Sequence, residues 1–487
     1  MSWLTQANAC PGVFYGTRAQ DGFLLRIRIP AGTLHLNQLK VIANLLTTLQ
    51  CDQVQVTNRA NLQIRGVQRA IDSSELNQLQ AVGLAATHPQ TDHLRNLMAS
   101  PTAGIDPEEL LDTRPYIQQI DQFLQQHPEY GELSAKFSIG LDGGGSVGIG
   151  TRSPVAWEHR LNDVQLTAIQ TNQQEIPFLL QLAVKKQLID TGYIITPDQL
   201  LPTIATLTAI YYEYSNQEVK AGRQGKPRLH SLIESWGLEQ FLQVIQERSR
   251  QSLETTQQSL PVSQPYRQFG FYPQSNPDLF YLGIRSFLGQ ITGLQLTALI
   301  QILEALNCQE IRLTPWQSLI VPNLNKSEVI EAQQRFQELG FATTAKEPVI
   351  IACAGHPVCQ AAIVPTQPLA ERLQQAIDQV CQALDPINIH ISACSKFCAQ
   401  SSPAEITILA ADSPEEQKPN ERYNIFFGDS DRFDRISGPS LSFHQVISFI
   451  TEVLKRYQKH RQSTSESLVQ FLLRSQFDLN TIVPVLL

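Results

Sequence analysis

Two stretches of this chain repeat one another, and this duplication limits the folds that the chain can adopt. Residues 22–67 and 279–324 align without a gap when one stretch is shifted by 257 positions. Identical residues then coincide at Phe23 and Phe280, Ile27 and Ile284, Arg28 and Arg285, Gly32 and Gly289, Gln38 and Gln295, Leu39 and Leu296, Cys51 and Cys308, and Thr57 and Thr314. Because the identities fall in regular elements and in the loops between them, they indicate a duplication and not a shared amphipathic pattern.

Hydrophobic periodicity predicts the same elements in each copy. In the first, a strand is expected from about residue 23 to 29, a helix from about 37 to 49, and a strand pair within 53–67 that turns at 58–61. One β-α-β-β unit cannot bury its own sheet face well, so we expect the two copies to pack as a pseudo-twofold pair. Cys51 and Cys308 stand at matching helix ends and Cys381 lies in a helical pattern, so all three are predicted to be core residues.

Length and composition define a multidomain globular protein. A chain of 487 residues is too long for one core and predicts two to four domains. The opening residues have no signal-peptide pattern and no apolar run is long enough for a membrane span, which predicts a cytoplasmic protein. The net charge of -8 argues against a nucleic-acid partner, because phosphate backbones require a basic surface.

Four cysteines in the last third form two pairs, Cys353 with Cys359 and Cys394 with Cys398, each in a loop after an apolar run. Four soft thiolates supplied by two short loops are typical of an iron–sulfur cubane. Structural zinc usually draws its thiols from tighter knuckles than the first pair. A disulfide framework is disfavoured in a chain with 8 Cys among 487 residues, and four buried structural thiols are a further alternative.

Basic residues of the first half are candidates for binding an anion. The turn of the first copy carries Arg59 and the strand after it carries Arg65, whereas Trp316 and Pro322 stand at those places in the second copy. Further candidates are Arg95, Lys136 and Arg152. Arg is suited to carboxylates because its planar fork can bind both oxygens, and Lys is a compact point charge. The alternative for each of these residues is a solvated surface charge.

A glycine-rich run from Gly140 to Gly150 invites comparison with nucleotide loops, but it lacks the Lys-Ser or Lys-Thr and the spacing that those loops need. We expect instead that its small residues let a large flat ligand approach the backbone. Asp142 would then be an acid facing that ligand, or else a plain turn former.

The cysteines, the duplication and the basic residues together resemble the sulfite and nitrite reductase superfamily. The resemblance implies an α+β fold of two duplicated ferredoxin-like half-domains (1–70 and 263–344) and two α/β domains. The first α/β domain (71–262) would bind a tetrapyrrole and the second (345–487) would carry a [4Fe-4S] cluster. Three stretches, CPGVFYGTRAQDGFLLRIRIPAG, LSAKFSIGLDGGG and ACSKFCAQSSPAEITI, look closest to precorrin-3B synthase.

That closer resemblance implies an O₂-dependent monooxygenase that hydroxylates precorrin-3A and forms a lactone in cobalamin biosynthesis. The alternatives are a ferredoxin-dependent sulfite or nitrite reductase with sirohaem, and a non-enzymatic tetrapyrrole-binding protein with a structural cluster. The implied cofactor is the [4Fe-4S] cluster, with sirohaem or a mononuclear non-haem iron as further candidates. The expected partners are the tetrapyrrole and an electron donor such as ferredoxin or a reductase, with no membrane.

The resemblance also assigns residues. It implies that the four cysteines bind the cluster, that Arg59 and Lys136 are catalytic, and that Arg59, Arg65, Arg95, Lys136 and Arg152 contact the tetrapyrrole. The second lysine of the reductases is missing, since Ser138 stands there. This departure favours the synthase. In the second cysteine loop, Phe397 and Gln400 stand where the synthase pattern has glycine and histidine. His356 either donates a hydrogen bond to a cluster sulfur or faces solvent.

Overall fold

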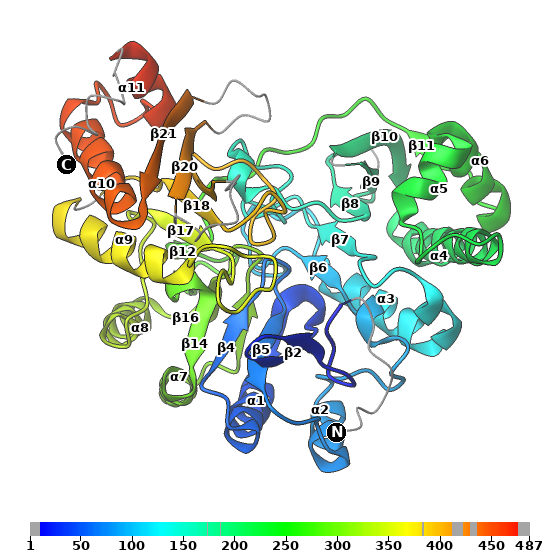
Figure 1. Ribbon diagram of the computed structural model, residues 1–487. Coiled ribbons are helices and arrows are strands. Elements are labelled where there is room, and N and C mark those ends of the chain that lie inside the picture. The colour runs from blue at the N-terminus through cyan, green and yellow to red at the C-terminus, as the bar shows by residue number, and fades with distance from the viewer. Residues whose placement is uncertain are drawn as a thin grey trace. The chain divides into compact units, whose positions relative to one another are not determined.

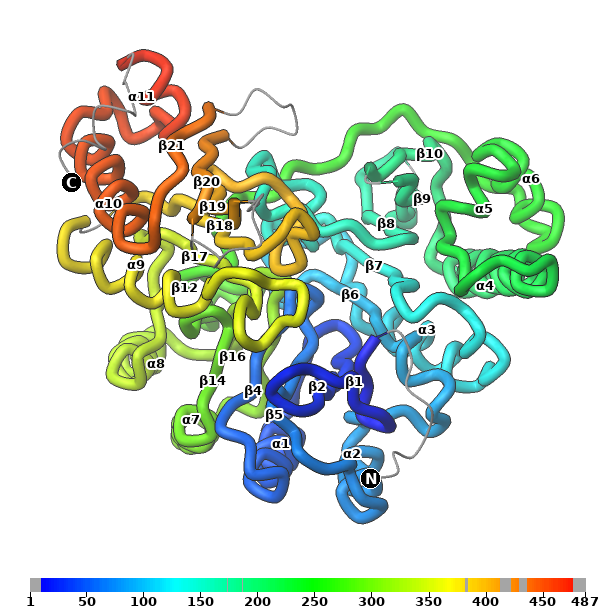
Figure 2. The backbone as a smooth tube through the Cα atoms, in the orientation of Figure 1, coloured from blue at the N-terminus to red at the C-terminus, as the bar shows by residue number. Residues whose placement is uncertain are grey.

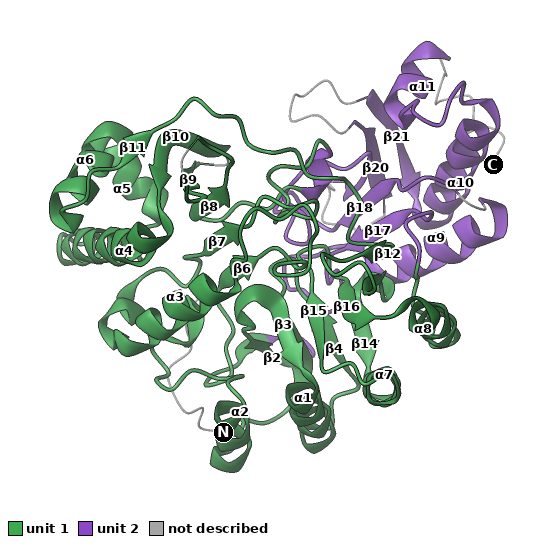
Figure 3. Cartoon of the chain, turned by 180° about the vertical axis from the view of Figure 1, so that it is seen from behind, with its two compact units in different colours: residues 1–18, 22–154, 159–343 green, residues 19–21, 155–158, 344–487 purple. Residues whose placement is uncertain are grey.

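The computed structural model describes residues 10–172, 174–185, 187–381, 384–411, 422–428 and 436–475. The chain divides into two compact units, coloured separately in Figure 3. The first comprises Met1–Arg18, Gly22–Pro154 and His159–Thr343, and the second comprises Ala19–Asp21, Val155–Glu158 and Thr344–Leu487. Within the described ranges, no helix has both the length and the apolar character needed to cross a membrane.

Each copy of the duplicated unit forms a five-stranded sheet in the first unit. The first sheet has the order β1 (Thr17–Ala19), β2 (Gly22–Ile27), β5 (Leu62–Val67), β4 (Gln53–Val56) and β14 (Gln290–Thr292). The second has the order β12 (Gly270–Pro273), β13 (Phe280–Ile284), β16 (Leu319–Leu324), β15 (Glu310–Leu313) and β3 (Thr33–His35). The helices of these copies are α1 (Leu36–Leu49), α2 (Ser73–Ala81), α7 (Gly293–Ala305) and α8 (Lys326–Glu338), as Figure 1 shows.

The two copies exchange strands. β3 of the first copy pairs with β15 of the second, and β14 of the second pairs with β4 of the first, both antiparallel. The helices α1 and α7 pack against each other, and one hydrophobic core contains residues of both copies. The path of the first copy from β2 through α1 to β4 and β5 can be followed in blue in Figure 2. The predicted duplication and pairing of the copies are therefore confirmed.

Even the strained backbone positions recur at the 257-residue shift. Ala31 and Leu288 have φ values of 60° and 52°, and Ala60 and Gln317 have φ values of 52° and 59°. A non-glycine residue adopts this left-handed conformation only where the surroundings enforce it. The short 3₁₀ turns η1 (Pro30–Gly32) and η5 (Phe287–Gly289) contain the first two of these residues. The two copies thus share detailed loop geometry as well as element order.

A third sheet in the first unit has six strands. Its order is β11 (Glu254–Thr255), β10 (Gln187–Ile195), β9 (Phe178–Val184), β8 (Val164–Ala168), β7 (Ile139–Asp142) and β6 (Leu97–Ala99). β6, β7 and β8 are parallel, and the remaining pairs are antiparallel. The associated helices are α3 (Arg114–Gln126), α4 (Pro197–Lys220), α5 (Leu229–Trp236) and α6 (Leu238–Ser249), with 3₁₀ turns η2 (Asp92–Leu94) and η3 (Pro128–Glu132).

The second unit is built on one five-stranded sheet. The order is β17 (Val349–Ala352), β18 (Asn388–Ser392), β19 (Ile406–Ala410), β20 (Arg422–Phe427) and β21 (Ile436–Ser442). Its helices are α9 (Gln367–Val380), α10 (Phe443–His460) and α11 (Leu468–Arg474), and a 3₁₀ turn, η4 (Ala156–Glu158), also belongs to it. β17, β18 and β19 are parallel and every residue of β18 is buried, as expected of a central strand covered on both faces. The loops after β17 and β18 consequently leave the same edge of the sheet.

Candidate functional site

The first sheet carries a polar face opposite its core. Apolar residues alternate with polar ones along its strands, so that Arg26 on β2, Gln63 on β5 and Gln55 on β4 share the face away from α1. Arg26 Nη2 donates to Gln63 Oε1 at 3.1 Å, and Gln63 Nε2 donates to Gln55 Oε1 at 2.6 Å. Gln55 Nε2 in turn donates to the carbonyl of Leu288 at 2.9 Å. A row of hydrogen-bonded polar groups therefore crosses three strands.

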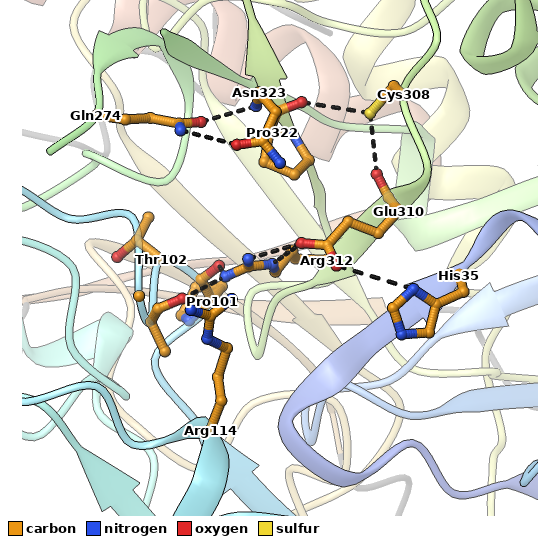
Figure 4. A network of polar contacts seen from close by, with 12 residues as sticks. His35, Pro101, Thr102, Arg114, Gln274, Cys308, Glu310, Arg312, Pro322 and Asn323 are labelled. Carbon is orange, nitrogen blue, oxygen red and sulfur yellow. Dashed lines mark hydrogen bonds and ion pairs between the residues drawn. The ribbon is translucent and has the colours of Figure 1, made fainter. Parts of the chain in front are cut away.

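The corresponding face of the second sheet is closed by the chain itself. Gly283 stands at the position of Arg26, and a Cβ there would lie 2.1 Å from the carbonyl oxygen of Gln268. Ile320 stands at the position of Gln63 and is fully buried. Arg312, at the position of Gln55, donates to the carbonyls of Pro101 and Ala103, at 3.3 and 2.7 Å, and forms an ion pair with Glu310 (Figure 4). The charged face thus belongs to the first copy.

Figure 4 also shows how the second copy uses its cysteine. Cys308 Sγ lies 3.3 Å from the carbonyl of Pro322 and 3.2 Å from that of Glu310. Burial raises the pKa of this thiol to about 11. Cys308 and Cys381 are buried, and Cys51 packs partly buried against the shared core. The prediction that these three cysteines are core residues is confirmed.

Arg26 has donor capacity that the described chain does not use. Its Nε is buried without a hydrogen-bond partner among the described residues. Burial, followed by the positive charges of Arg28 and Arg59, lowers the pKa of this guanidinium from 12.5 to about 10. A bound anion would both accept from Nε and offset the crowding of positive charge. Sequence reasoning missed Arg26, although its place in the alternating pattern of β2 could have indicated it.

Arg59 lies in the tight turn between β4 and β5. The turn is held by Thr57, whose backbone carbonyl accepts from the N–H of Ala60 and whose side chain accepts from the N–H of Asn61. Arg59 Nη1 donates to Asn162 Oδ1 at 2.7 Å and to Ser138 Oγ at 3.2 Å. Burial lowers the pKa of this guanidinium, while the negative charge of Asp163 acts in the opposite direction. Within the described ranges, Arg59 Nε and Nη2 have no partner.

Arg65 and Lys136 are two further predicted residues of the first unit. Arg65 is partly buried and alternates with Ile64 on β5, so it stands on the same sheet face as Gln63. Lys136 is exposed in the turn that precedes β7, two residues before Ser138. In the part of the chain that the structure describes, its ammonium group has no partner. Both residues therefore remain candidates for contact with an anion.

The structure does not bring Arg95 to this face. Its guanidinium donates to Asp121 of α3 at 3.1 and 3.3 Å and to the carbonyl of Gly83 at 2.9 Å. It lines a different cavity of the first unit, of about 410 Å³, together with Arg28 and Arg114. The neighbouring Asn96 contacts the Arg59 turn instead, accepting from Asn61 Nδ2 at 3.1 Å.

The guanidinium of Arg152 is also fully bonded to other groups of the chain. Its Nε and Nη2 donate to both oxygens of Asp142 at 3.0 and 2.8 Å, and neither side chain is exposed. Nη1 donates to the carbonyl of Pro261 at 2.8 Å, and Nη2 also donates to that of Gly145 at 2.7 Å. All three nitrogens are used, so we leave Arg152 out of the site. The expectation that Asp142 faces a ligand is corrected in the same way.

The glycines of the 140–150 run are required by internal packing. A Cβ at Gly143 would lie 2.4 Å from Glu109 Oε1, and one at Gly148 would lie 2.5 Å from Asp142 Oδ2. A Cβ at Gly145 would lie 2.8 Å from the carboxylate of Asp106. Contacts this short leave no room for any side chain. The loop is therefore packed against the carboxylates of Asp106, Glu109 and Asp142, and the expectation of a close ligand approach finds no support here.

The four predicted cluster ligands converge in the second unit. Cys353 directly follows β17, and a single residue separates Cys394 from the end of β18. These two strands are parallel neighbours. The pKa of the Cys398 thiol is raised, first by burial of the thiol and then by the charges of Cys394, Cys353 and Cys359, although the residue as a whole is exposed. All four thiols are free of disulfides. The two loops therefore bring the other three thiols within electrostatic reach of Cys398.

This arrangement fits a cluster better than a single ion. Within the described ranges, no group of three or more His, Cys, Asp or Glu side chains could hold one metal ion. A cubane separates its thiolates, because irons and sulfides lie between them, whereas zinc draws its ligands into one tetrahedron. Neither the zinc alternative nor a mononuclear iron finds a site there.

The structure explains the two residues of the second cysteine loop, Phe397 and Gln400, that depart from the synthase pattern. Phe397 has φ 48°, a left-handed conformation that favours glycine. Gln400 is buried and donates from Nε2 to Asn388 Oδ1 at 2.7 Å, so it anchors the loop to β18. His356 is exposed, as in the solvent-facing alternative.

Comparisons with known proteins agree with this picture. Residues 90–253 match the nitrite and sulphite reductase 4Fe-4S domain, and residues 15–70 and 272–339 match the nitrite/sulfite reductase ferredoxin-like half domain. The ferredoxin–nitrite reductase of Synechococcus elongatus is 25% identical over 91% of this chain and 87% of its own length. The chloroplastic ferredoxin–nitrite reductase of Arabidopsis thaliana is 27% identical over 86% and 72%.

Two mycobacterial proteins extend the comparison. Sulfite reductase (ferredoxin) 2 of Mycolicibacterium paratuberculosis is 24% identical over 94% of this chain and 83% of its own length. The solved structure of Mycobacterium tuberculosis NirA superposes with a TM-score of 0.74 at 21% identity, covering 94% of this chain and 84% of that one. The structural likeness shows the fold, and it confirms the predicted α+β class with duplicated ferredoxin-like half-domains.

Four convergent thiols, together with the match to a 4Fe-4S domain, define an iron–sulfur oxidoreductase. The chain belongs to the nitrite/sulfite reductase superfamily. These matches confirm the predicted [4Fe-4S] cluster and, of the two further candidates, support sirohaem over a mononuclear iron. The matched 4Fe-4S domain ends before Cys353, so the assignment of the four ligands rests on the convergence of the thiols.

The prediction of precorrin-3B synthase activity is wrong. The relatives named above are nitrite and sulfite reductases, and they match over most of the chain. The missing second lysine had favoured the synthase, but the structure gives Ser138 another explanation. Its hydroxyl is a buried hydrogen-bonding partner of Arg59, which requires no change of substrate.

Proposed function

We propose that this protein is a ferredoxin-dependent reductase of a small oxyanion, with nitrite as its substrate. The observation that carries the proposal is the open polar face of the first sheet, where Arg26 and Arg59 have guanidinium donors without partners in the described chain. The names of the relatives support the same activity. They also support ferredoxin as the electron donor.

The arginines of this face would hold the carboxylates of sirohaem. Arg26, Arg59 and Arg65 lie on or beside one sheet face, and a planar guanidinium binds a carboxylate through two parallel hydrogen bonds. Burial strengthens such contacts, because little water competes for the donors. When bound, sirohaem and the [4Fe-4S] cluster supply the electron transfer that amino-acid side chains cannot perform.

Lys136 is assigned to the oxyanion. Its ammonium is exposed and unpaired within the described residues, so Nζ is available to attract the substrate and to donate a proton to its oxygen. Together with Arg59, it forms the catalytic pair that the sequence suggests. Arg95 is left out because its guanidinium is bound to Asp121.

The count of cations favours nitrite over sulfite. Ser138 is neutral and stands where the resemblance places the second lysine of the reductases, so the site has one cation fewer. Fewer positive charges attract a dianion less strongly, whereas nitrite carries one charge and sulfite carries up to two near neutral pH. Sulfite is the second candidate, because one relative is named a sulfite reductase.

We also propose four functional segments, 1–70, 71–262, 263–344 and 345–487. Each of the four sheets draws its strands from one segment, apart from the exchanged strands β3 and β14. The first three segments would provide the tetrapyrrole site and its framework. The last would provide the cluster ligands Cys353, Cys359, Cys394 and Cys398.

The test uses the holoprotein purified without oxygen. We expect sirohaem absorption bands, about four irons per chain with matching acid-labile sulfide, and nitrite consumption with reduced ferredoxin as donor. The value of kcat/KM should be higher for nitrite than for sulfite, and Lys136→Ala should lower kcat by about 10²-fold or more. Lys40→Ala, which removes an exposed lysine paired with Glu304, is the matched control.

Other outcomes are informative. A higher kcat/KM for sulfite would assign sulfite as the substrate. A protein without sirohaem bands that reduces neither oxyanion would contradict the proposal and favour a non-enzymatic tetrapyrrole-binding protein.

A further inference from the structure

Ser138 is the centre of a buried polar cluster in the first unit. Its hydroxyl donates to Asp163 Oδ2 at 3.2 Å, and it accepts from the backbone N–H of Asp163 at 3.2 Å and from Arg59 Nη1 at 3.2 Å. Ser138 is 1% exposed. A hydroxyl has one proton and two lone pairs, so these three contacts use its whole capacity.

Asp163 fixes the direction in which that hydroxyl points. Its Oδ2 accepts from both the backbone N–H and the hydroxyl of Ser138, at 3.1 and 3.2 Å. Because the hydroxyl proton is directed to this carboxylate, the lone pairs of Ser138 are free to accept from Arg59. Asp163 is 3% exposed, and a carboxylate at this depth requires a compensating charge.

Arg228 supplies that charge. Its Nη2 donates to Asp163 Oδ1 at 2.8 Å, and its side chain is 33% exposed. Arg228 is the N-cap residue that immediately precedes helix α5, in a segment to which the sequence assigns no chemistry. A continuous line of contacts therefore runs from Arg228 through Asp163 and Ser138 to Arg59.

We propose that Arg228 is a positioning residue for Arg59, acting through Asp163 and Ser138, and that it thereby helps to hold a carboxylate of the tetrapyrrole. This inference rests on the proposed function, since it takes Arg59 as a contact of the bound macrocycle. Loss of the Arg228 side chain removes the ion-pair partner of Asp163 Oδ1, so the carboxylate is free to move and the Ser138 hydroxyl loses its fixed orientation. Arg59 Nη1 is left with Asn162 as its one dependable acceptor among the described residues.

A purely structural role is the rival explanation. The Arg228–Asp163 ion pair also ties the start of α5 to the segment before β8, and its loss would loosen that junction whatever Arg59 does. The two explanations differ in whether the effects of Arg228 and Arg59 are coupled. Residues that act through one another give non-additive effects, whereas independent sites give additive ones.

The experiment is a double-mutant cycle on the sirohaem-bearing holoprotein. The measured quantity is the rate at which sirohaem is lost to an excess of apomyoglobin, followed by its absorption bands. We expect Arg228→Gln and Arg59→Ala each to raise this rate by about tenfold, and the double variant to lose sirohaem no faster than Arg59→Ala alone. Arg228→Lys, which keeps the charge, should restore most of the retention.

Controls separate positioning from folding. Arg248→Gln removes an exposed ion pair between α6 and α4, with Glu213 at 2.7 Å, and should leave the rate unchanged. If Arg228→Gln does not fold, Ser138→Ala interrupts the same line of contacts without removing a charge and should reproduce the faster loss.

Three results would overturn the inference. Unchanged sirohaem retention in Arg228→Gln would exclude a link to the macrocycle, and multiplying effects in the double variant would assign Arg228 to structure alone. Both leave the proposed reductase function in place. A wild-type protein that holds no sirohaem would overturn the function and this inference together.

Discussion

Arg26 and Gly283 occupy the same position in the two copies of the duplicated unit, and they make opposite use of it. Arg26 extends from β2 and donates to Gln63 across the sheet face. Gly283 has no side chain, and the carbonyl of Gln268 lies where its Cβ would be, at 2.1 Å. The duplication has therefore produced one sheet with an open charged face and one whose face is filled by the chain.

Substitution of Gly283 by Ala should destabilise the protein by about 1–3 kcal/mol, because the added methyl group meets a backbone oxygen that cannot move without distorting the 266–270 turn. Urea denaturation measures the change. Gly293→Ala is the matched control, since its Cβ would have no neighbour closer than 3.8 Å. Equal free energies of unfolding for the two variants would contradict the tight contact.

Removal of Arg26 should separate stability from cofactor binding. Burial lowers the pKa of this guanidinium to about 10. Below that pH the buried positive charge therefore reduces the stability of the folded apoprotein. We expect Arg26→Ala to stabilise the apoprotein by about 1 kcal/mol at pH 7 and to reduce the sirohaem bound per chain severalfold. Thermal unfolding and absorption spectra measure the two effects. A variant that is less stable and still fully loaded would show that Arg26 serves the fold.

Each of the four convergent cysteines should be needed for the cluster. Cys→Ser at residue 353, 359, 394 or 398 removes one thiolate donor, and we expect iron and acid-labile sulfide to fall by about half or more. Cys381→Ser is the control, because this buried residue lies at the end of α9, outside the two loops. Full iron content in any of the four variants would remove that residue from the ligand set.

The cysteines and the duplication were predictable from sequence for physical reasons. A gapless repeat forces two similar units, and parallel strands deliver their following loops to one edge, so Cys353 and Cys394 had to converge once β17 and β18 paired. The helix at 37–49 and the strand pair within 53–67 follow equally from periodicity, and the structure places α1, β4 and β5 there.

The roles of the charged residues were harder to predict, because the local sequence does not reveal the partner of a charged side chain. The position of Arg152 beside a glycine run is compatible with binding either a ligand or Asp142, and in the structure it binds Asp142. Arg95 likewise could not be assigned without α3, which brings Asp121 to it. The alternation along β2 places Arg26 on a polar sheet face, but it does not show that Gln268 fills the corresponding face of the other sheet.

Glu109 should make stability fall with rising pH. Burial raises the pKa of this carboxyl to about 8, and the N–H of Gly104, which donates to Oε2 at 2.5 Å, offsets part of that effect. Between its ordinary value of 4.5 and about 8, the folded state binds more protons than the unfolded state, so the stabilisation present below pH 4.5 is lost as pH rises through this window.

Glu109→Gln removes this titration. We expect the variant to match the wild type near pH 5 and to exceed it by about 1–3 kcal/mol near pH 9, as measured by urea denaturation. Glu108→Gln, at an exposed neighbouring position, is the control. A wild-type protein whose unfolding free energy does not fall between these pH values would show that Glu109 is ionised throughout.

Thr366 should tune the cluster through the first cysteine loop. Its Oγ1 donates to the carbonyl of Cys353 at 2.6 Å and lies 3.8 Å from the sulfur of the same residue, which also accepts from the N–H of Ala393 at 3.3 Å. The Thr366 hydroxyl gives its single proton to that carbonyl, so it orients the loop in which the N–H of Ala393 meets the sulfur. Hydrogen-bond donors to a cluster thiolate stabilise the more reduced, more negative state and raise the reduction potential. Thr366→Val keeps the shape of the side chain and removes the hydroxyl, so the midpoint potential should become more negative and the cluster should be lost several times faster on exposure to oxygen.

Thr366→Ser keeps the hydroxyl and should retain the wild-type potential. Redox titration of the holoprotein followed by electron paramagnetic resonance distinguishes the two variants, and equal potentials in Thr366→Val and Thr366→Ser would limit Thr366 to packing against Gly355, whose Cβ would lie 2.2 Å from Oγ1.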